Sequence, residues 1–550
     1  MKTSRWFRIF MMALDTVVLF FLRMFRRFDH LYSYEPSEQS SVNDEPHSVA
    51  KTTAEALGIE CALEVDGTVT EEYRRTEEIY FAPNEPYTNM RGIVTFRGDN
   101  MRSGATYGTL AATPSTIKKE WSIATGRLQK GYGKGFWTGS GWTGQPLIVC
   151  WDDEIRKLMN IYPHKKQKEN LTEAIYSTMD GNVYFIDVED GERTRDDLHV
   201  GLPFKGAGAI DPRGIPMLYL GPGDSCGEES ARGFIYSLID FEKLYEFGAN
   251  DPFALRKFHG YDSSVLVSEK TDTLIAPGEN GIIYTMKLNT KFDKATGKLS
   301  INPSEFVKLR YKTYRSSEQS YWLGMEDSGV IWKNYLYIAD NGGNLMCIDL
   351  NTMKLVWAQD VVDDTNGSPV MSVEDNVPYI YIATSLHWTA SRRLKLGDVP
   401  IFKINAITGE YVWRHTYLCN TVAGISGGVQ ATCINGKHSI SDLVIFPVAR
   451  TPQVRVGIIA ALDKKSGKEV WRYNCGQYAW SSPVDVYDQE GNAFIVTCNS
   501  AGEVALIDGR TGKLIDNLNL GSNIEASPAV FGNMLVVGTR GQEIVGLKLS

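Results

Sequence analysis

The sequence lacks several patterns that define common classes of enzyme and binding protein. Its eight cysteines stand apart from one another, and its eight histidines show no paired spacing of the kind that marks a zinc site. No cluster of Lys and Arg follows residue 30, and the net charge of -9 disfavours a nucleic-acid-binding surface. Long amphipathic helices are scarce. The sequence therefore gives no support to a zinc protein or to a nucleic-acid-binding protein.

What the sequence has in quantity is glycine and aromatic residues, with 51 Gly, 27 Tyr, 22 Phe and 12 Trp. This composition suits an all-β chain of short strands joined by tight turns. A unit of about 50 residues returns eight times, which is the size of one four-stranded propeller blade. In each copy a short apolar strand ends at a marker position, and these positions are Asp187, Ile239, Lys287, Asp349, Asn405, Asp463, Asp508 and Lys548.

The turn after the marker position has a physical explanation in several copies. In one copy, Asp463 and Ser466 can accept or donate local backbone hydrogen bonds while Gly467 takes the left-handed conformation of a tight hairpin. A tryptophan then recurs on the outer strand, where a large flat side chain can pack between neighbouring blades. We therefore predict a structural role between blades for Trp121, Trp357, Trp413 and Trp471.

The repeats predict an eight-bladed β-propeller of four-stranded antiparallel blades over residues 118–550. The last blade is incomplete, because the chain stops at Ser550 directly after the strand that contains Leu547. Lys118–Gly126 supplies a match for the missing outer strand, with Trp121 in the recurrent position. We expect this N-terminal strand to complete the last blade and to close the ring without open sheet edges.

The amino terminus differs from the rest of the chain. An apolar run from Ile9 to Leu22 has Arg and Lys on both sides, which predicts a membrane anchor or signal segment over residues 1–28. Asp15 within the run leaves an interfacial helix as an alternative. Residues 29–53 are polar and aperiodic, which predicts a flexible linker, and residues 54–117 predict an irregular N-terminal cap over one face of the ring.

Two short patterns resemble catalytic or nucleotide-binding motifs without their structural context. Gly424, Ser426 and Gly428 match the hydrolase elbow, but they occupy a column of the repeat that leads into an inner strand. Gly139, Gly141 and Gly144 match a dinucleotide fingerprint, but no βαβ unit surrounds them. We assign no catalytic residue and no metal ligand from the sequence.

A binding site is predicted from geometry instead. In a propeller, the segments that lead into the innermost strands converge at one mouth of the central channel. Carboxylates beside aromatic faces suit a cation, a sugar or a basic peptide. The alternative is that each acid caps its own loop and each tryptophan fills a gap between blades. The residues predicted at the mouth are Trp142, Asp262, Trp322, Glu326, Asp327, Trp480 and Glu525.

The repeat resembles a known family. The pattern of Gly, apolar positions, Asp, Thr-Gly and Trp, as in Gly457–Trp471 and Gly502–Gly512, is similar to the pyrroloquinoline-quinone-like (PQQ-like) propeller repeat. That repeat occurs in quinoprotein alcohol dehydrogenases and in the lipoprotein scaffold of bacterial outer-membrane protein assembly. The resemblance covers residues 118–550 and implies the fold. It does not imply quinone chemistry, and the adjacent cysteine pair of the alcohol dehydrogenases is lacking here.

Three functions are compatible with these patterns. We expect a membrane-tethered, extracytoplasmic, non-catalytic scaffold that binds a protein or a cell-envelope component through its ring face, with no cofactor. The first alternative is an oxidoreductase that holds PQQ over the mouth with a calcium ion on residues such as Glu326 and Asp327. The second is a carbohydrate-binding propeller that uses the aromatic residues of the mouth.

Overall fold

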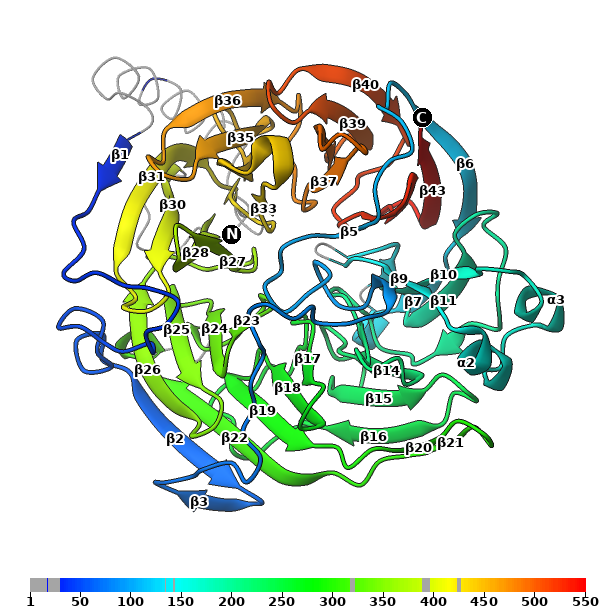
Figure 1. The fold of residues 1–550 in the computed structure, drawn as a ribbon, viewed down its shortest axis with the longest axis horizontal. Helices are drawn as coiled ribbons and strands as arrows, with labels where there is room; N and C mark the ends of the chain where they lie inside the picture. The colour runs from blue at the N-terminus through cyan, green and yellow to red at the C-terminus, as the bar shows by residue number, and fades with distance from the viewer. Residues whose placement is uncertain are drawn as a thin grey trace.

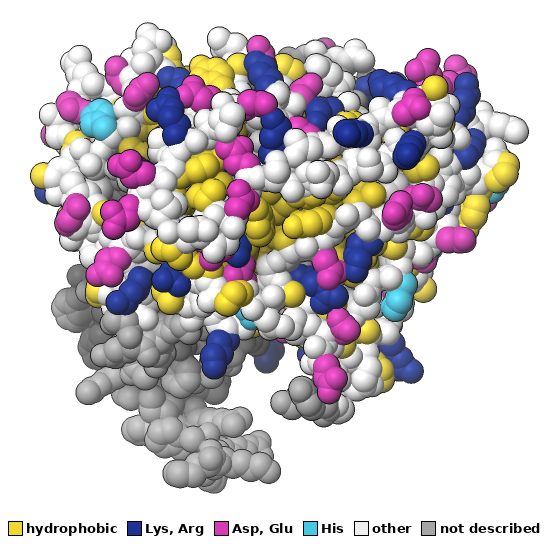
Figure 2. All heavy atoms as spheres, turned by 90° about the horizontal axis from the view of Figure 1, so that it is seen from below, with side chains coloured by type: hydrophobic (Ala, Val, Ile, Leu, Met, Phe, Trp, Pro, Cys, Tyr) yellow, Lys and Arg dark blue, Asp and Glu magenta, His cyan; other side chains and the backbone are white. Residues whose placement is uncertain are grey.

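The structure is a computed structural model that describes residues 30–133, 135–141, 144–316, 322–387, 396–422 and 427–550, together with Val17. Eight antiparallel sheets surround a central axis and form a closed ring (Figure 1). The wall of this ring carries interspersed acidic and basic side chains on the side seen in Figure 2. The prediction of an all-β, eight-bladed propeller is confirmed.

Each blade has four main strands, which we number as blades 1 to 8 in chain order. From the channel outward, blades 1 to 4 consist of β9 (Leu147–Cys150), β10 (Thr172–Ser177), β11 (Asn182–Asp187) and β12 (Leu198–His199); β13 (Ala209–Ile210), β14 (Met217–Leu220), β15 (Gly233–Ser237) and β16 (Lys243–Phe247); β17 (Leu266–Ser268), β18 (Thr273–Pro277), β19 (Ile282–Lys287) and β22 (Ser304–Lys312); and β23 (Val330–Trp332), β24 (Tyr335–Ala339), β25 (Asn344–Asp349) and β26 (Lys354–Asp360).

Blades 5 to 8 follow the same plan. They consist of β27 (Val370–Glu374), β28 (Val377–Ala383), β30 (Leu396–Asn405) and β31 (Tyr411–Asn420); β33 (Ile434–Asn435), β34 (Leu443–Ala449), β35 (Gly457–Asp463) and β36 (Glu469–Asn474); β37 (Val484–Tyr487), β38 (Ala493–Cys498), β39 (Glu503–Asp508) and β40 (Leu514–Asn519); and β41 (Ala529–Phe531), β42 (Met534–Gly538), β43 (Glu543–Leu549) and β6 (Ile117–Ala124).

Smaller elements lie between these strands. They are the hairpins β7 (Arg127–Gln129) with β8 (Phe136–Thr138) and β20 (Lys291–Asp293) with β21 (Lys298–Ser300), the pair β29 (Ser385–Leu386) and β32 (Gly427–Gly428), the helices α2 (Asp153–Leu158) and α3 (Pro163–Lys166), and the single turns η1 (Gly131–Gly133), η2 (Tyr314–Ser316) and η4 (His438–Ile440).

The recurrent tryptophans lie between adjacent blades. Trp413 on β31 is buried, and its Nε1 donates a hydrogen bond to Lys464 O of the next blade at 2.9 Å. Its ring covers Gly467, where an added Cβ would lie 2.7 Å from Trp413 Cδ2. The equivalent contacts are Trp121 to Val188 O and Gly191, Trp357 to Ala406 O and Gly409, and Trp471 to Gly509 O and Gly512. The turn glycine is therefore required by both its positive φ and the ring above it.

The ends of the propeller meet in blade 8. β43 pairs antiparallel with β6, so that Trp121 lies opposite Gly546 (Figure 1). An added Cβ at Gly546 would lie 2.0 Å from Trp121 Cε2, which explains why a glycine faces the indole. The pairing gives the last blade its outer strand.

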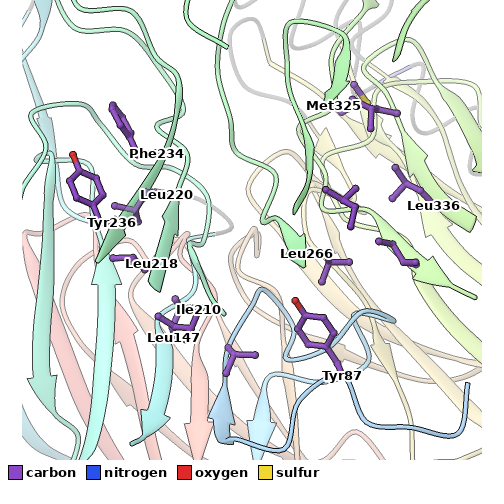
Figure 3. Close-up of a cluster of buried hydrophobic side chains, with 14 of the residues drawn as sticks. Tyr87, Leu147, Ile210, Leu218, Leu220, Phe234, Tyr236, Leu266, Met325 and Leu336 are labelled. Carbon is purple, nitrogen blue, oxygen red and sulfur yellow. The ribbon is translucent and has the colours of Figure 1, made fainter. Parts of the chain in front are cut away.

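Arginines take the position of the indole at two other blade junctions. Arg195 donates from Nη1 to Leu238 O at 2.8 Å between blades 1 and 2, and it pairs with buried Glu173. Arg75 donates from Nε to Leu350 O at 3.3 Å between blades 3 and 4. The core beside these junctions is aliphatic and aromatic, and Figure 3 shows Leu218 and Leu220 of β14 within it.

Hydroxyl groups link the innermost strands around the channel. Ser264 N donates to Ser328 Oγ at 2.9 Å, and Ser328 N donates to Ser368 Oγ at 2.8 Å. The series continues through Thr432, Ser482 and Ser527. In blade 6 the linking hydroxyl belongs to Thr432, because β29 and β32 precede the inner strand. The repeat predicts this position at Ser426–Gly428 instead. Ser426 lies outside the described residues.

Residues 91–107 pass through the centre of the ring, and we call them the plug. The plug begins with β4 (Arg91–Ile93), which pairs with β9, and ends with β5 (Thr106–Tyr107), which pairs with β41. Between them, Arg97 donates to Pro483 O and Cys433 O at 2.7 and 3.1 Å. Arg102 donates to Gly329 O and Ser264 O at 3.0 and 2.7 Å. The predicted cap thus lies partly inside the channel.

The segment expected as a flexible linker is docked along the outside of the ring. β1 (His30–Ser33) pairs with β31, and Thr52 Oγ1 donates to Thr408 O at 2.8 Å. Part of the predicted cap also lies on the outside, where β2 (Glu60–Val65) pairs with β22 and with β3 (Thr68–Thr70) at the edge of blade 3. The prediction of a free tether was wrong, because open strand edges offer backbone partners to a polar segment.

The predicted membrane anchor cannot be placed in this fold. Its apolar run, Ile9–Leu22, lies outside the described residues apart from Val17. Among the described residues, no helix has the length and apolar character needed to cross a membrane.

Candidate functional site

The candidate site lies at the mouth, which we define as the end of the channel where the innermost strands begin. Neighbouring strands of a blade run antiparallel, so the turn between the second and third strands lies at the same end as the start of the first strand. Two sets of loops from every blade therefore meet at the mouth. Side chains separated by 60 residues in the sequence become neighbours there.

Three carboxyl groups from blades 3 and 4 form a cluster at the mouth. Asp262 precedes β17, Glu279 lies in the turn between β18 and β19, and Glu326 precedes β23. Asp262 and Glu279 are buried, with exposed fractions of 6% and 2%, whereas Glu326 is partly exposed. Asp262 lies within hydrogen-bonding reach of Glu279. We call these three residues the carboxyl cluster.

Two basic side chains contact this cluster. Arg256 Nη1 lies 3.8 Å from Glu279 Oε2 and donates to Asn341 Oδ1 at 3.2 Å. Asn341 in turn donates to Glu326 Oε1 at 2.8 Å. Lys205 Nζ donates to Gly223 O at 2.8 Å, and its charge acts on all three carboxyls of the cluster. Two cations therefore face three acids.

Glycines make room for these groups. An added Cβ at Gly223 would lie 2.0 Å from Asp262 Oδ1, and one at Gly260 would lie 2.4 Å from Glu279 Oε1. At Gly324, an added Cβ would lie 1.9 Å from Arg256 Nη1. The backbone thus approaches each charged group more closely than any other residue type would allow.

Burial and mutual repulsion shift the protonation of the cluster. Burial raises the pKa of Asp262, and it raises the pKa of Glu279 well above its usual value, with the charge of Glu326 adding to the effect. Burial, together with the charge of Asp364, raises the pKa of Glu326 to about 7. At neutral pH the carboxyl cluster therefore carries fewer charges than it has acids.

A second group lies beside the cluster in blade 5. Asp364 Oδ2 lies 2.6 Å from His387 Nδ1 and also accepts from Asn366 Nδ2 at 2.8 Å. Burial alone would lower the pKa of His387, but the bond to Asp364 outweighs it and raises that pKa to about 9. The indole of Trp322 meets the His387 ring edge to face, with centroids 6.4 Å apart.

Aromatic rings flank the cluster on the opposite side, toward blades 1 and 2. Lys205 Nζ lies 5.8 Å from the ring centroid of Trp137 and 5.7 Å from that of Phe258. Arg256 Cζ lies 5.0 Å from the Phe258 centroid. Trp137 and Phe258 are both partly exposed, so aromatic surface is present beside the charges.

The structure brings together only some of the residues predicted at the mouth. Asp262 and Glu326 belong to the cluster, and Trp322 contacts His387 beside it. Asp327 is buried within blade 4, where its Oδ2 accepts from Ala339 N at 3.2 Å. The others are not part of the cluster: Glu525 lies 3.6 Å from Arg540, Trp480 packs on Tyr478, and Trp142 lies outside the described residues.

Sequence reasoning missed Lys205, Glu279, Arg256, Asp364 and His387. A signal existed for Glu279, because it lies two residues after β18, at the turn that returns to the mouth in every blade. Examining those turns together with the connections would have found it. The remaining four lie in irregular segments, and their approach depends on the tertiary fold.

The residues of the mouth do not fit PQQ with calcium. Within the described ranges, no group of three or more His, Cys, Asp or Glu side chains is arranged to hold a metal ion. Of the two proposed ligands, Asp327 accepts from a backbone amide inside blade 4, and Glu326 accepts from Asn341. A tricarboxylate quinone would also meet the carboxyl cluster, whose charge repels it.

Comparisons with known proteins agree with the fold. A family model described as outer membrane protein assembly factor BamB matches residues 455–549. A curated tetrathionate hydrolase from Acidithiobacillus ferrooxidans is 29% identical over 143 residues, which is 26% of this chain and 26% of that protein. The chain thus spans about a quarter of the length of that relative.

Solved structures of similar shape have low sequence identity. BamB from Moraxella catarrhalis is 13% identical with a TM-score of 0.44, covering 78% of this chain and 97% of that chain. A europium-containing methanol dehydrogenase is 14% identical with a TM-score of 0.40, covering 83% and 98%. A quinohemoprotein alcohol dehydrogenase from Pseudomonas putida HK5 is 11% identical with a TM-score of 0.39, covering 84% and 80%.

These observations define the class of the protein as an eight-bladed β-propeller. Over residues 455–549 the chain is also similar to the family model described above. The resemblance to PQQ-like repeat propellers, predicted from the sequence, is confirmed.

Proposed function

We propose that this propeller is a non-catalytic scaffold that binds a protein partner at its mouth. The observation that carries the proposal is the carboxyl cluster, whose charges are only partly compensated by Lys205 and Arg256. A buried acid without full compensation lowers stability, so its presence at the mouth favours a role in binding. Partly exposed aromatic rings beside it are typical of protein interfaces.

The plug supports binding at the mouth over transport through the ring. Its backbone or side chains contact the innermost strands of all eight blades, from β9 to β41. A ligand that enters the channel meets the buried side chains of Arg97 and Arg102. A filled channel disfavours transport, and this supports binding at the mouth.

The proposal includes membrane attachment through the N-terminal segment, with the propeller outside the cytoplasm. The basic residues on both sides of the apolar run support attachment. The described part of the chain begins at His30, and β1 pairs with β31 of blade 5. An anchor there would hold the propeller close to the membrane by the edge of blade 5.

Site-specific photocrosslinking in native cells tests the proposal. A crosslinking amino acid at Phe258 reports on the mouth, and one at Leu514, which is exposed on β40, serves as the control on the outer wall. We expect one protein to be captured from position 258 and not from position 514. Capture of the same protein from Leu514 alone would contradict binding at the mouth.

A further inference from the structure

We propose that the carboxyl cluster recognises a single Lys or Arg side chain of the partner, whose charged group takes the place of a proton held among Asp262, Glu279 and Glu326. This inference rests on the proposed function and names the chemical group that is bound. The displaced proton passes to solvent, so the charge within the site is conserved on binding. An ammonium or guanidinium group supplies both the charge and the donors that the cluster lacks.

The first argument is the lack of donors within the cluster. Asp262 Oδ1 and Glu279 Oε1 are buried and accept no hydrogen bond from any donor group of the described residues. The two carboxyls lie within reach of one another, so a proton shared between them relieves the repulsion when the site is empty. These buried oxygens are a second observation, independent of the clustering of acids, that points to a cationic ligand.

The second argument is that the protein's own cations are occupied elsewhere. Arg256 Nη1 donates to three acceptors, Glu279 O, Leu323 O and Asn341 Oδ1, and remains 3.8 Å from the Glu279 carboxylate. Lys205 Nζ bonds to Gly223 O and lies 3.9 Å from Asp224. Neither cation donates to Asp262 Oδ1 or Glu279 Oε1, and the glycines at 223 and 260 bring no side chain to these oxygens.

The third argument concerns the ligand's hydrocarbon stem. Lys and Arg carry several methylene groups behind the charge, and these pack well on aromatic faces. Trp137 and Phe258 are partly exposed rings of this kind; Lys130 and Lys205 lie beside Trp137, and Lys205 and Arg256 lie beside Phe258. Glu326 is the partly exposed member of the cluster, so it lies on the side from which a ligand approaches.

Calorimetric titration of the purified full chain tests the inference with a matched pair of probes. N-acetyl-lysine methylamide carries the ammonium group, and N-acetyl-norleucine methylamide has the same stem without it. At pH 8 we expect the lysine probe to bind at least tenfold more tightly than the norleucine probe. Lowering the pH to 5.5 protonates the cluster and weakens binding of the lysine probe, with proton release measured from buffers of different ionisation enthalpy.

Variants locate the binding. Glu279→Gln and Glu326→Gln are each expected to weaken binding of the lysine probe at least tenfold, because each substitution removes a negative charge without changing the shape of the side chain. Glu469 on β36 accepts from Arg472 and from the Tyr417 hydroxyl on the outer wall. Glu469→Gln is the matched control, and its affinity for the lysine probe is expected to stay within twofold of that of the parent. Equal binding of both probes, or Glu279→Gln and Glu326→Gln both within twofold, overturns the inference.

The two proposals fail separately. If crosslinking at Phe258 captures a partner but the lysine probe does not bind, the named ligand group is wrong while binding at the mouth stands. If a neutral glucan oligosaccharide binds and the lysine probe does not, the site is a carbohydrate site and the inference is overturned. If the lysine probe binds and no partner is captured, the protein-binding scaffold fails.

Discussion

Arg102 in the plug and Glu279 at the mouth are buried to a similar extent, but their hydrogen bonds are satisfied differently. In the plug, Arg102 is 1% exposed, and Nε, Nη1 and Nη2 all donate to carbonyl or hydroxyl oxygens. At the mouth, Glu279 is 2% exposed, and its Oε1 accepts from no donor of the described residues. The two regions lie along the same channel.

This difference separates a structural role from a binding role. A fully bonded arginine fixes the innermost strands of several blades, and burial lowers its pKa only to about 10, so it keeps its charge. An under-bonded carboxyl contributes nothing comparable to the fold and lowers its stability at neutral pH. We infer that the plug maintains the ring and that the mouth is kept available for a ligand.

The largest expected effect is at the plug. Arg102→Ala leaves Ser264 O, Gly329 O and Thr95 without their donor and should reduce the free energy of unfolding by about 3–5 kcal/mol. Urea denaturation followed by tryptophan fluorescence measures the change.

The control for this substitution is an exposed ion pair. Arg510→Ala removes the pair with Asp442, whose side chains are 51% and 47% exposed, and should change the free energy of unfolding by less than about 0.5 kcal/mol. An equal loss of unfolding free energy in Arg102→Ala and Arg510→Ala would show that the buried hydrogen bonds of Arg102 do not stabilise the ring more than an exposed ion pair does.

The mouth should show the opposite sign. Glu279→Gln is expected to increase the free energy of unfolding by about 1–3 kcal/mol at pH 8, since an amide has no charge to bury. The pKa of Glu279 is raised in the folded protein, so this gain is absent below its unfolded value of 4.5 and grows as the pH rises. A destabilised variant at pH 8 would show that Glu279 supports the fold.

Glu326 gives an effect with a defined pH range. Its pKa is about 7 in the folded protein against 4.5 unfolded, so the stability linked to its protonation is complete below pH 4.5 and is lost as the pH rises to 7. The stability difference between Glu326→Gln and the parent should rise over this interval to about 3 kcal/mol and then level off. Denaturation curves at five pH values would measure it, and a difference that does not vary with pH would contradict the assignment.

The fold was largely predictable from the sequence, for a physical reason. Each blade repeats the same local chemistry, in which a turn glycine such as Gly467 or Gly512 lies under a tryptophan of the preceding blade. Where an arginine takes the place of the tryptophan, as at Arg195, the repeat is harder to detect in the sequence. No sequence pattern indicated that this arginine has the role of the recurrent tryptophan. The docking of residues 30–53 was missed because a polar segment that pairs with a strand edge has no hydrophobic period.

The site was only partly predictable. Asp262 and Glu326 were found because they precede innermost strands, which converge in any propeller. Asp327 follows Glu326 directly, yet the alternation of an extended chain turns it into blade 4, so adjacency in sequence was misleading. Lys205 and Arg256 reach the mouth from long connections, whose path no local pattern encodes.

The central claim is that the buried acids of the mouth lower the free energy of unfolding and bind a cationic group of a ligand. The double variant Glu279→Gln/Glu326→Gln tests this claim most directly. Its urea midpoint and its affinity for N-acetyl-lysine methylamide are measured on one preparation at pH 8. We predict that the double variant unfolds at higher urea concentration than the parent and binds the probe at least tenfold more weakly. A double variant that is less stable and binds the probe as tightly as the parent would contradict the account.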